Sequence, residues 1–157
     1  MKYHKQINDY TCGSTALVNV MKDFGIELTE KYIRRLLGTN KEGTDGFSIL
    51  MVAEDYNFET KEVKSKSIDV FKRKLIKDLK LGYKIILITD NNQHWISVLG
   101  YYNRKTKIVD SRYADELKKP IVQYVTAKQL ADRSHNYDLE TNVKEFYYIA
   151  LKLAEDN

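Results

Sequence analysis

At four places in the first 82 positions, apolar residues recur three or four apart, which is the spacing of a helix that buries one face. Two of these repeats are bracketed by residues that favour helix ends, with Ser or Thr before the start and Gly after the end. The pattern therefore predicts four helices. They run from about Gly13 to Phe24, between Thr29 and Gly38, from Gly46 or Ser48 to about Asn57, and between Ser67 and Gly82.

After Gly82 the helical spacing gives way to the short apolar runs and alternation that are typical of strands. Residues 120–134 predict an extended piece followed by a short helix capped by Thr126. The chain is therefore expected to be α+β, with an N-terminal helical half packed on a C-terminal antiparallel sheet. The predicted strands are YKIILIT at 83–89, HWISVLGYY at 94–102, KIVDS after a hairpin turn at 103–106, and KEFYYIALKL at 144–153.

A chain of 157 residues that is 43% hydrophobic suits one domain spanning 1–157. Its single Cys excludes an intramolecular disulfide, and the opening segment MKYHKQINDY lacks the apolar stretch of a signal peptide. No segment has the roughly 18 consecutive apolar residues that a membrane span needs. We therefore expect a cytoplasmic protein without a membrane span, and the sequence carries no signal for its oligomeric state.

The net charge of +4 arises from 26 basic and 22 acidic residues that are largely interspersed. The densest basic stretch is KRKLIKDLK at 72–80, where the charges alternate with apolar residues at helical spacing. This spacing is typical of a solvated helix face. No aromatic-interleaved basic motif accompanies it, so we expect no nucleic-acid partner, although a nucleic-acid binder remains an alternative.

The only Cys lies in NDYTCGSTALVNV at 8–20, at the predicted start of the first helix. Free N–H groups and the positive end of the helix dipole lower the pKa of a Cys there, and the thiolate is the nucleophilic form. A small buried hydrophobe is the alternative for Cys12. Its neighbours Thr11, Gly13 and Ser14 are small and polar rather than core-forming, which favours a functional thiol.

A thiol nucleophile for acyl transfer also needs a base and a group that orients the base. His94 opens a predicted strand directly after a polar turn, whereas His4 and His135 lie in polar segments and are expected to be solvated. The hairpin turn at 103–106 would bring the end of the next strand, with Asp110, beside His94. An ordinary strand-end histidine and a carboxylate that bonds only to its own turn are the alternatives.

A side-chain amide near the nucleophile could complete this set. Gln6 precedes Cys12 by a short segment that could return its amide to the thiol. There the NH₂ group would face a developing oxyanion, together with the backbone N–H of Cys12. The alternative is that Gln6 is a polar residue in a flexible N-terminal arm with no part in the reaction.

Several motifs in this order resemble the C39 peptidase family, the papain-like domain of bacterial double-glycine leader peptidases. They are Q-x5-C-G-x-x-A-L from Gln6, GTDGFSILMVAEDY at 43–56, HWISVLG at 94–100 and VDS at 109–111. The resemblance covers roughly residues 3–113 and implies a papain-like fold. It also implies that Cys12 is the nucleophile, His94 the general base and acid, Asp110 the orienting group and Gln6 the oxyanion donor.

The resemblance implies hydrolysis of a peptide bond in a peptide or protein substrate, after a Gly-Gly sequence. Longer members of the family continue into the membrane and nucleotide-binding domains of an exporter, and this sequence contains neither an apolar span nor a phosphate-binding loop. No cofactor is required, and the widely spaced histidines do not suggest a metal site. Another thiol acyl transfer, such as deamidation or transglutamination, and a non-catalytic peptide-binding module remain alternatives.

Overall fold

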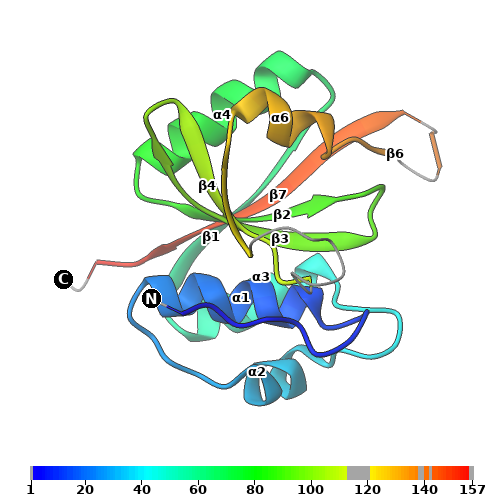
Figure 1. Cartoon of the computed structure of the whole chain (residues 1–157). Coiled ribbons are helices and arrows are strands. Elements are labelled where there is room, and N and C mark those ends of the chain that lie inside the picture. Colours follow the sequence, from blue (N-terminus) through cyan, green and yellow to red (C-terminus); the bar gives the residue numbers. More distant parts are fainter. Residues whose placement is uncertain (1, 113–120, 138–139, 142, 156–157) are drawn as a thin grey trace.

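The computed structural model describes residues 2–112, 121–137, 140–141 and 143–155 and has helices on both faces of an antiparallel sheet (Figure 1). The predicted α+β class is confirmed. The helices are α1 (Cys12–Asp23), α2 (Glu30–Leu37), α3 (Gly46–Asp55), α4 (Ile68–Lys80) and α6 (Ala127–Asp132). The strands are β1 (Phe58–Ser65), β2 (Lys84–Thr89), β3 (His94–Tyr102), β4 (Lys105–Val109), β5 (Val122–Val125), β6 (Asn136–Tyr137) and β7 (Lys144–Leu153).

The helix ends follow the capping residues of the sequence, with one exception. Thr29, Ser67 and Thr126 each accept a hydrogen bond from a backbone N–H in the first turn of the helix that follows. At α3 the capping residue is Asp45, whose carboxylate accepts from the Ser48 N–H, so of the two predicted starts Gly46 is right and Ser48 is not.

The sheet has the order β1-β7-β2-β3-β4-β5, and every pair is antiparallel. The short strand β6 pairs with β7 outside this path. Strand β1 was not predicted, because FETKEVKS carries few apolar residues. It forms at the sheet edge through pairing along its whole length with β7, from Phe58 opposite Leu153 to Ser65 opposite Phe146.

The sheet is covered by helices on both faces. Helices α1, α2 and α3 lie on one face, and α4 and α6 lie on the other (Figure 1). Successive residues of β2 alternate between the two cores: Ile86 belongs to the cluster with α1, and Ile85 and Leu87 belong to the cluster with α4. Pro120, at the start of the predicted extended piece, lies outside the described residues.

Within the part of the chain that the structure describes, no helix is long and apolar enough to cross a membrane.

Candidate active site

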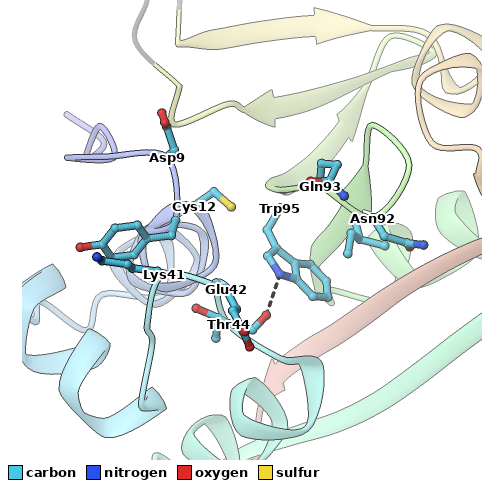
Figure 2. Close-up of a pocket in the computed structure, with 11 residues that line it drawn as sticks. Asp9, Cys12, Lys41, Glu42, Thr44, Asn92, Gln93 and Trp95 are labelled. Atoms are coloured by element: carbon cyan, nitrogen blue, oxygen red, sulfur yellow. Dashed lines mark hydrogen bonds between the residues drawn. The ribbon is translucent and has the colours of Figure 1, made fainter.

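Cys12 is the first residue of α1 and lies at the wall of a cavity of about 490 Å³ (Figure 2). The side chain of the preceding residue, Thr11, does not cap the helix; its hydroxyl accepts from the backbone N–H groups of Ile7 and Asn8 instead. The N–H groups of the first turn of α1 therefore have no side-chain acceptor on Thr11. Cys12 is 5% exposed.

The small polar residues around Cys12, which the sequence did not mark as core-forming, are buried. Ser14 donates to the Glu30 carboxylate at 2.8 Å, and Thr15 donates to the Thr11 carbonyl at 2.7 Å. These side chains, like that of Thr11, have no exposed surface. Their polarity therefore reflects hydrogen bonding inside the protein, and it did not indicate exposure.

Gly13 allows α1 to approach the opposite wall of the cavity. A Cβ at this position would lie 2.7 Å from Cβ of Thr44 and 3.1 Å from Cδ1 of Trp95. The Trp95 indole is itself fixed, because its Nε1–H donates to the Thr44 carbonyl at 3.1 Å (Figure 2). Only a residue without a side chain fits between these groups, so α1 starts in contact with the wall that faces Cys12.

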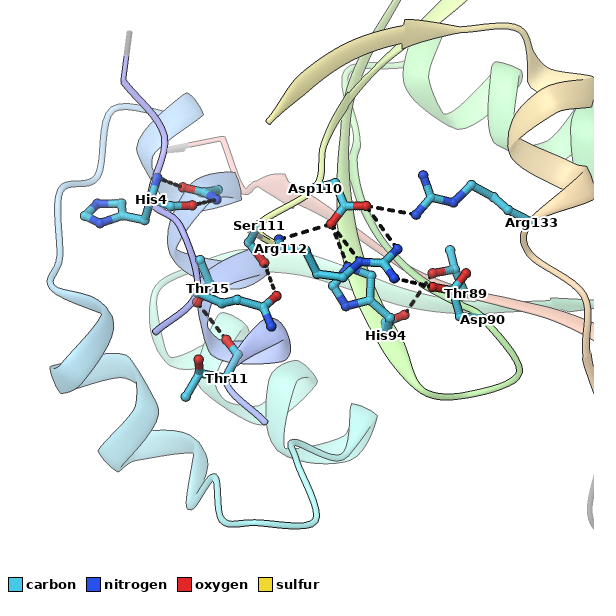
Figure 3. A network of polar contacts seen from close by, with 12 residues as sticks. His4, Thr11, Thr15, Thr89, Asp90, His94, Asp110, Ser111, Arg112 and Arg133 are labelled. Carbon is cyan, nitrogen blue, oxygen red and sulfur yellow. Dashed lines mark hydrogen bonds and ion pairs between the residues drawn. The ribbon is translucent and has the colours of Figure 1, made fainter. Parts of the chain in front are cut away.

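The hairpin of β3 and β4 places His94 beside Asp110. Its turn consists of Asn103 and Arg104, both with positive φ, as in the tight turns that suit the twist of a hairpin. His94 opens β3, Asp110 follows the last residue of β4, and the two meet with Nε2 and Oδ1 2.7 Å apart (Figure 3). Both side chains are buried.

The pKa values of Cys12 and His94 shift in opposite directions. Burial by itself raises the pKa of the Cys12 thiol, but hydrogen bonds with His94 and with the backbone N–H groups of Trp95 and Gly13 outweigh it, so the pKa lies below its ordinary value. Burial by itself lowers the pKa of His94, but hydrogen bonds with Asp110 and Cys12 outweigh it and raise the pKa. Both shifts favour a negative sulfur next to a positive imidazole.

Asp110 also binds two arginines that the sequence did not point to. Arg133 donates to Oδ2 at 2.9 Å and Arg112 donates to the same oxygen at 3.2 Å (Figure 3). Arg112 also forms an ion pair with Asp90 on the turn between β2 and β3, with Nη1 and Oδ2 2.8 Å apart. Burial by itself raises the pKa of the Asp110 carboxyl, but His94 and the two guanidinium groups hold it well below its usual range. Asp110 is therefore an ionised carboxylate shared among three cationic partners.

Gln6 is held at the same strand end. Its backbone N–H donates to the Ser111 carbonyl at 2.8 Å, and its side-chain oxygen accepts from the Ser111 hydroxyl at 3.0 Å. Its Nε2 donates to the Asn8 carbonyl at 3.0 Å. Gln6 is 5% exposed. The segment that carries it is thus a fixed part of the fold, and a flexible arm is excluded.

The same N-terminal segment is tied to α1 on the other side of Gln6. The backbone of His4 exchanges two hydrogen bonds with the Asn19 side chain (Figure 3), and the Tyr3 hydroxyl donates to Asp23 at 2.7 Å. These contacts fix the path of the segment along the helix that begins with Cys12. Gln6 is therefore positioned between α1, which begins with Cys12, and the end of β4.

The other two histidines are separate from this cluster. His4 is half-buried and takes part through its backbone. His135 was predicted to be solvated, but its ring packs on Phe146 with the centroids 4.9 Å apart, and its Nδ1 is buried. Among the described residues, no group of three or more His, Cys, Asp or Glu side chains is arranged to hold a metal ion.

Comparison with solved structures shows the same fold in peptidase domains of transporters. The peptidase domain of Streptococcus ComA, a bi-functional ABC transporter, superposes with a TM-score of 0.69 at 24% identity and covers 98% of both chains. A double glycine motif protease from an AMS/PCAT transporter, in complex with the leader peptide, superposes with a TM-score of 0.66 at 16% identity and covers 94% of this chain and 90% of that one.

Sequence comparison identifies relatives and a family model that match this chain. An uncharacterized protein of Methanothermobacter thermautotrophicus is 28% identical over 105 residues, which are 67% of this chain and 68% of that protein. The model of the peptidase C39 family matches residues 1–122, which include Gln6, Cys12, His94 and Asp110. With most of its length matched by that model, the chain belongs to the peptidase C39 family.

Proposed function

We propose that the protein is a cysteine peptidase that cuts a peptide bond through Cys12, His94 and Asp110. One observation carries the proposal: Nε2 of His94 lies 2.7 Å from the buried Asp110 carboxylate, and His94 lowers the pKa of the Cys12 thiol at the start of α1. This arrangement supports the roles of nucleophile, base and orienting group that acyl transfer requires. The thiol also lines a cavity that could admit a substrate.

In the proposed reaction, the Cys12 thiolate attacks the carbonyl carbon, a C–S bond forms and the carbonyl oxygen becomes an oxyanion. Because Nε2 of His94 is bonded to Asp110, the proton that was on the thiol resides on Nδ1. Collapse of the intermediate breaks the C–N bond, and Nδ1 gives this proton to the departing amine. Water then attacks the thioester, gives a proton to Nδ1, and releases the acid and the Cys12 thiolate.

Gln6 is proposed to stabilise the oxyanion with its side-chain NH₂. One of its two N–H bonds is used by the Asn8 carbonyl, and the second has no partner among the residues described. The Asn8 carbonyl can only accept, so it fixes which end of the amide is the donor, and the Ser111 hydroxyl then binds the amide oxygen. The backbone N–H of Cys12 would be the second donor of the oxyanion hole.

The proposed substrate is a peptide cut after a Gly-Gly sequence. Support comes from membership of the C39 family and from the structural likeness to a double glycine motif protease bound to a leader peptide. The direct test incubates the purified protein with a library of peptides that contain Gly-Gly, next to the same library with Ala in place of the second Gly. Cleavage after Gly-Gly, read by mass spectrometry and absent with Cys12→Ala, is expected.

Mass spectrometry also separates the alternative functions. A deamidase would change a Gln or Asn side chain without cutting the chain, and a transglutaminase would join two peptides with loss of ammonia. A peptide-binding module would leave every mass unchanged while still retaining a peptide. Either of the first two product patterns, or unchanged masses throughout the library, would contradict the proposed peptidase.

A further inference from the structure

A groove lined by basic side chains adjoins the cavity that contains Cys12. Its volume is about 540 Å³, and it is lined by Tyr10, Lys31, Arg34, Arg35, Gly38, Thr39, Asn40 and Lys41. Four of these residues are cationic and none is acidic. Tyr10 and Lys41 also line the cavity of Cys12, so the two depressions share a wall. We call this site the basic groove.

The cations of the basic groove are concentrated on one side of α2. Lys31, Arg34, Arg35 and Gly38 follow the three- and four-residue spacing that puts side chains on one helix face. Lys41 comes from the loop after α2 and lies near Cys12 (Figure 2). The groove thus has a helical wall and a loop wall, each of which contributes positive charge.

Stabilisation of α2 does not account for this charge. Basic residues near a helix C-terminus favour the helix dipole, which explains Arg34 and Arg35. Lys31, however, lies in the first turn, where the dipole disfavours a cation, and Lys41 lies beyond the helix. Among the described residues, only Arg34 of the four has an acidic partner, Glu30 at 3.6 Å. Lys31, Arg35 and Lys41 remain available to an anion.

The charge changes sign between the groove and the cavity. Asp9 and Glu42 lie at the cavity of Cys12, with Lys41 next to them (Figure 2). A substrate with acidic residues directly at the scissile bond would meet these carboxylates. A substrate with acidic residues farther along the chain would place them against Lys31 and Arg35.

We infer that the basic groove binds an acidic segment of the peptide substrate, separated from the scissile bond by uncharged residues. The inference rests on the proposed peptidase function, because the wall shared with the Cys12 cavity is what makes a peptide the occupant. A nucleic acid is the other polyanion that such charges could bind. The neighbouring thiol, however, is proposed to attack a carbonyl carbon, which favours a peptide as the occupant.

Binding is tested on the Cys12→Ala protein, so that no cleavage interferes. The probes are fluorescent Gly-Gly peptides with a run of Glu placed on the N-terminal or the C-terminal side, next to peptides with Gln in the same positions. One of the two Glu peptides is expected to bind about tenfold more tightly than its Gln counterpart, as two or three exposed ion pairs would provide. High salt should remove most of this difference.

Charge variants locate the effect. Lys31→Gln with Arg35→Gln should remove most of the preference for Glu. The matched control, Arg73→Gln with Lys74→Gln, deletes the same charge from exposed positions of α4, on the opposite face of the sheet, and should retain the preference. Equal binding of Glu and Gln peptides, an unchanged preference in the α2 variant, or preferential binding of a single-stranded oligonucleotide would overturn the inference.

The wild-type protein separates this inference from the proposed function. Cleavage of Glu and Gln peptides with the same kcat/KM would contradict the basic groove and leave the peptidase intact. Absence of cleavage of every Gly-Gly peptide would contradict the peptidase, while the binding measurements on Cys12→Ala would still decide whether the groove holds an acidic peptide.

Discussion

The hydroxyl of Ser111 donates a hydrogen bond to the amide oxygen of Gln6, 3.0 Å away. Ser111 directly follows Asp110, so one strand end holds both the carboxylate that contacts His94 and the group that orients the Gln6 amide. A displacement of this strand end would therefore move both groups. A test of the proposed role of Gln6 must therefore also measure the reactivity of the thiol.

Gln6→Ala is expected to lower peptide turnover about 10²–10³-fold, comparable to the loss of one oxyanion donor in other enzymes. Alkylation of Cys12 by iodoacetamide should remain close to normal, because displacement at its carbon forms no tetrahedral oxyanion. Both rates are measured on the same preparation. Unchanged turnover would exclude the oxyanion role, and a parallel loss of both rates would mean that the substitution had disturbed Cys12 itself.

Ser111→Ala is the matched variant for this test. It removes the bond to the amide oxygen but keeps the backbone contact between Gln6 N–H and the Ser111 carbonyl. Turnover should fall by less than in Gln6→Ala, since the donor is still present but less firmly oriented. A larger loss than that of Gln6→Ala would indicate that Ser111 acts mainly on Asp110.

The rate of Cys12 alkylation should show a thiolate at a pH below the value of about 8.5 that is typical of a free Cys. The pKa of Cys12 is lowered and that of His94 is raised, so the ion pair exists in the window between the two. Below this window the sulfur gains a proton and alkylation slows; above it His94 loses its proton while the thiolate remains. His94→Ala should move the inflection upward, and a wild-type inflection at or above 8.5 would contradict an activated thiol.

Asp110→Asn and Arg133→Gln should shift the pKa of His94 in opposite directions. Asp110 raises this pKa, so its replacement by Asn lowers it and slows turnover. Arg133 binds Oδ2 of the same carboxylate, and its removal leaves more negative charge for the imidazolium, which raises the pKa. The check is an NMR titration of His94 for each variant. Shifts of the same sign would contradict the shared-carboxylate arrangement.

Gly13→Ala should destabilise the fold by about 1–3 kcal/mol, as overpacking of a tight contact does. The new Cβ would meet Cβ of Thr44 at 2.7 Å and its Oγ1 at 2.9 Å. Thr44→Gly removes both atoms, so the double variant should recover part of the stability lost in Gly13→Ala. Urea unfolding of the four proteins of this cycle gives the coupling, and strictly additive effects would exclude the contact as the cause.

Elements with their own end signals could be predicted from the sequence, and elements formed by distant pairing could not. Thr29 and Ser67 marked their helices because capping is a local interaction. Strand β1 had no such signal, since its polar residues suit an edge and its stability comes from β7. The placement of α4 on the second face of the sheet likewise depends on packing that no local pattern contains.

The residues of the candidate site likewise divide into those that local sequence could predict and those that only the fold brings together. His94 and Asp110 could be paired because a short hairpin connects them, and Cys12 could be placed because helix starts are visible in the sequence. Arg133 reaches Asp110 from the residue after α6, and nothing near it in the sequence indicates that contact. Contacts of this kind follow only from the three-dimensional fold.

The position of β7 in the sheet has a consequence for the nascent chain on the ribosome. Residues 144–153 are synthesised after all the other described strands, yet β7 lies between β1 and β2. Until they emerge, β1 lacks the one strand it pairs with among the described residues and β2 has one open edge, so the sheet under α1 is divided in two. Such long-range pairing is slow compared with local helix and hairpin formation. A nascent chain that already displays α1, β3 and β4 therefore still lacks the strand that joins the two parts of the sheet beneath the thiol.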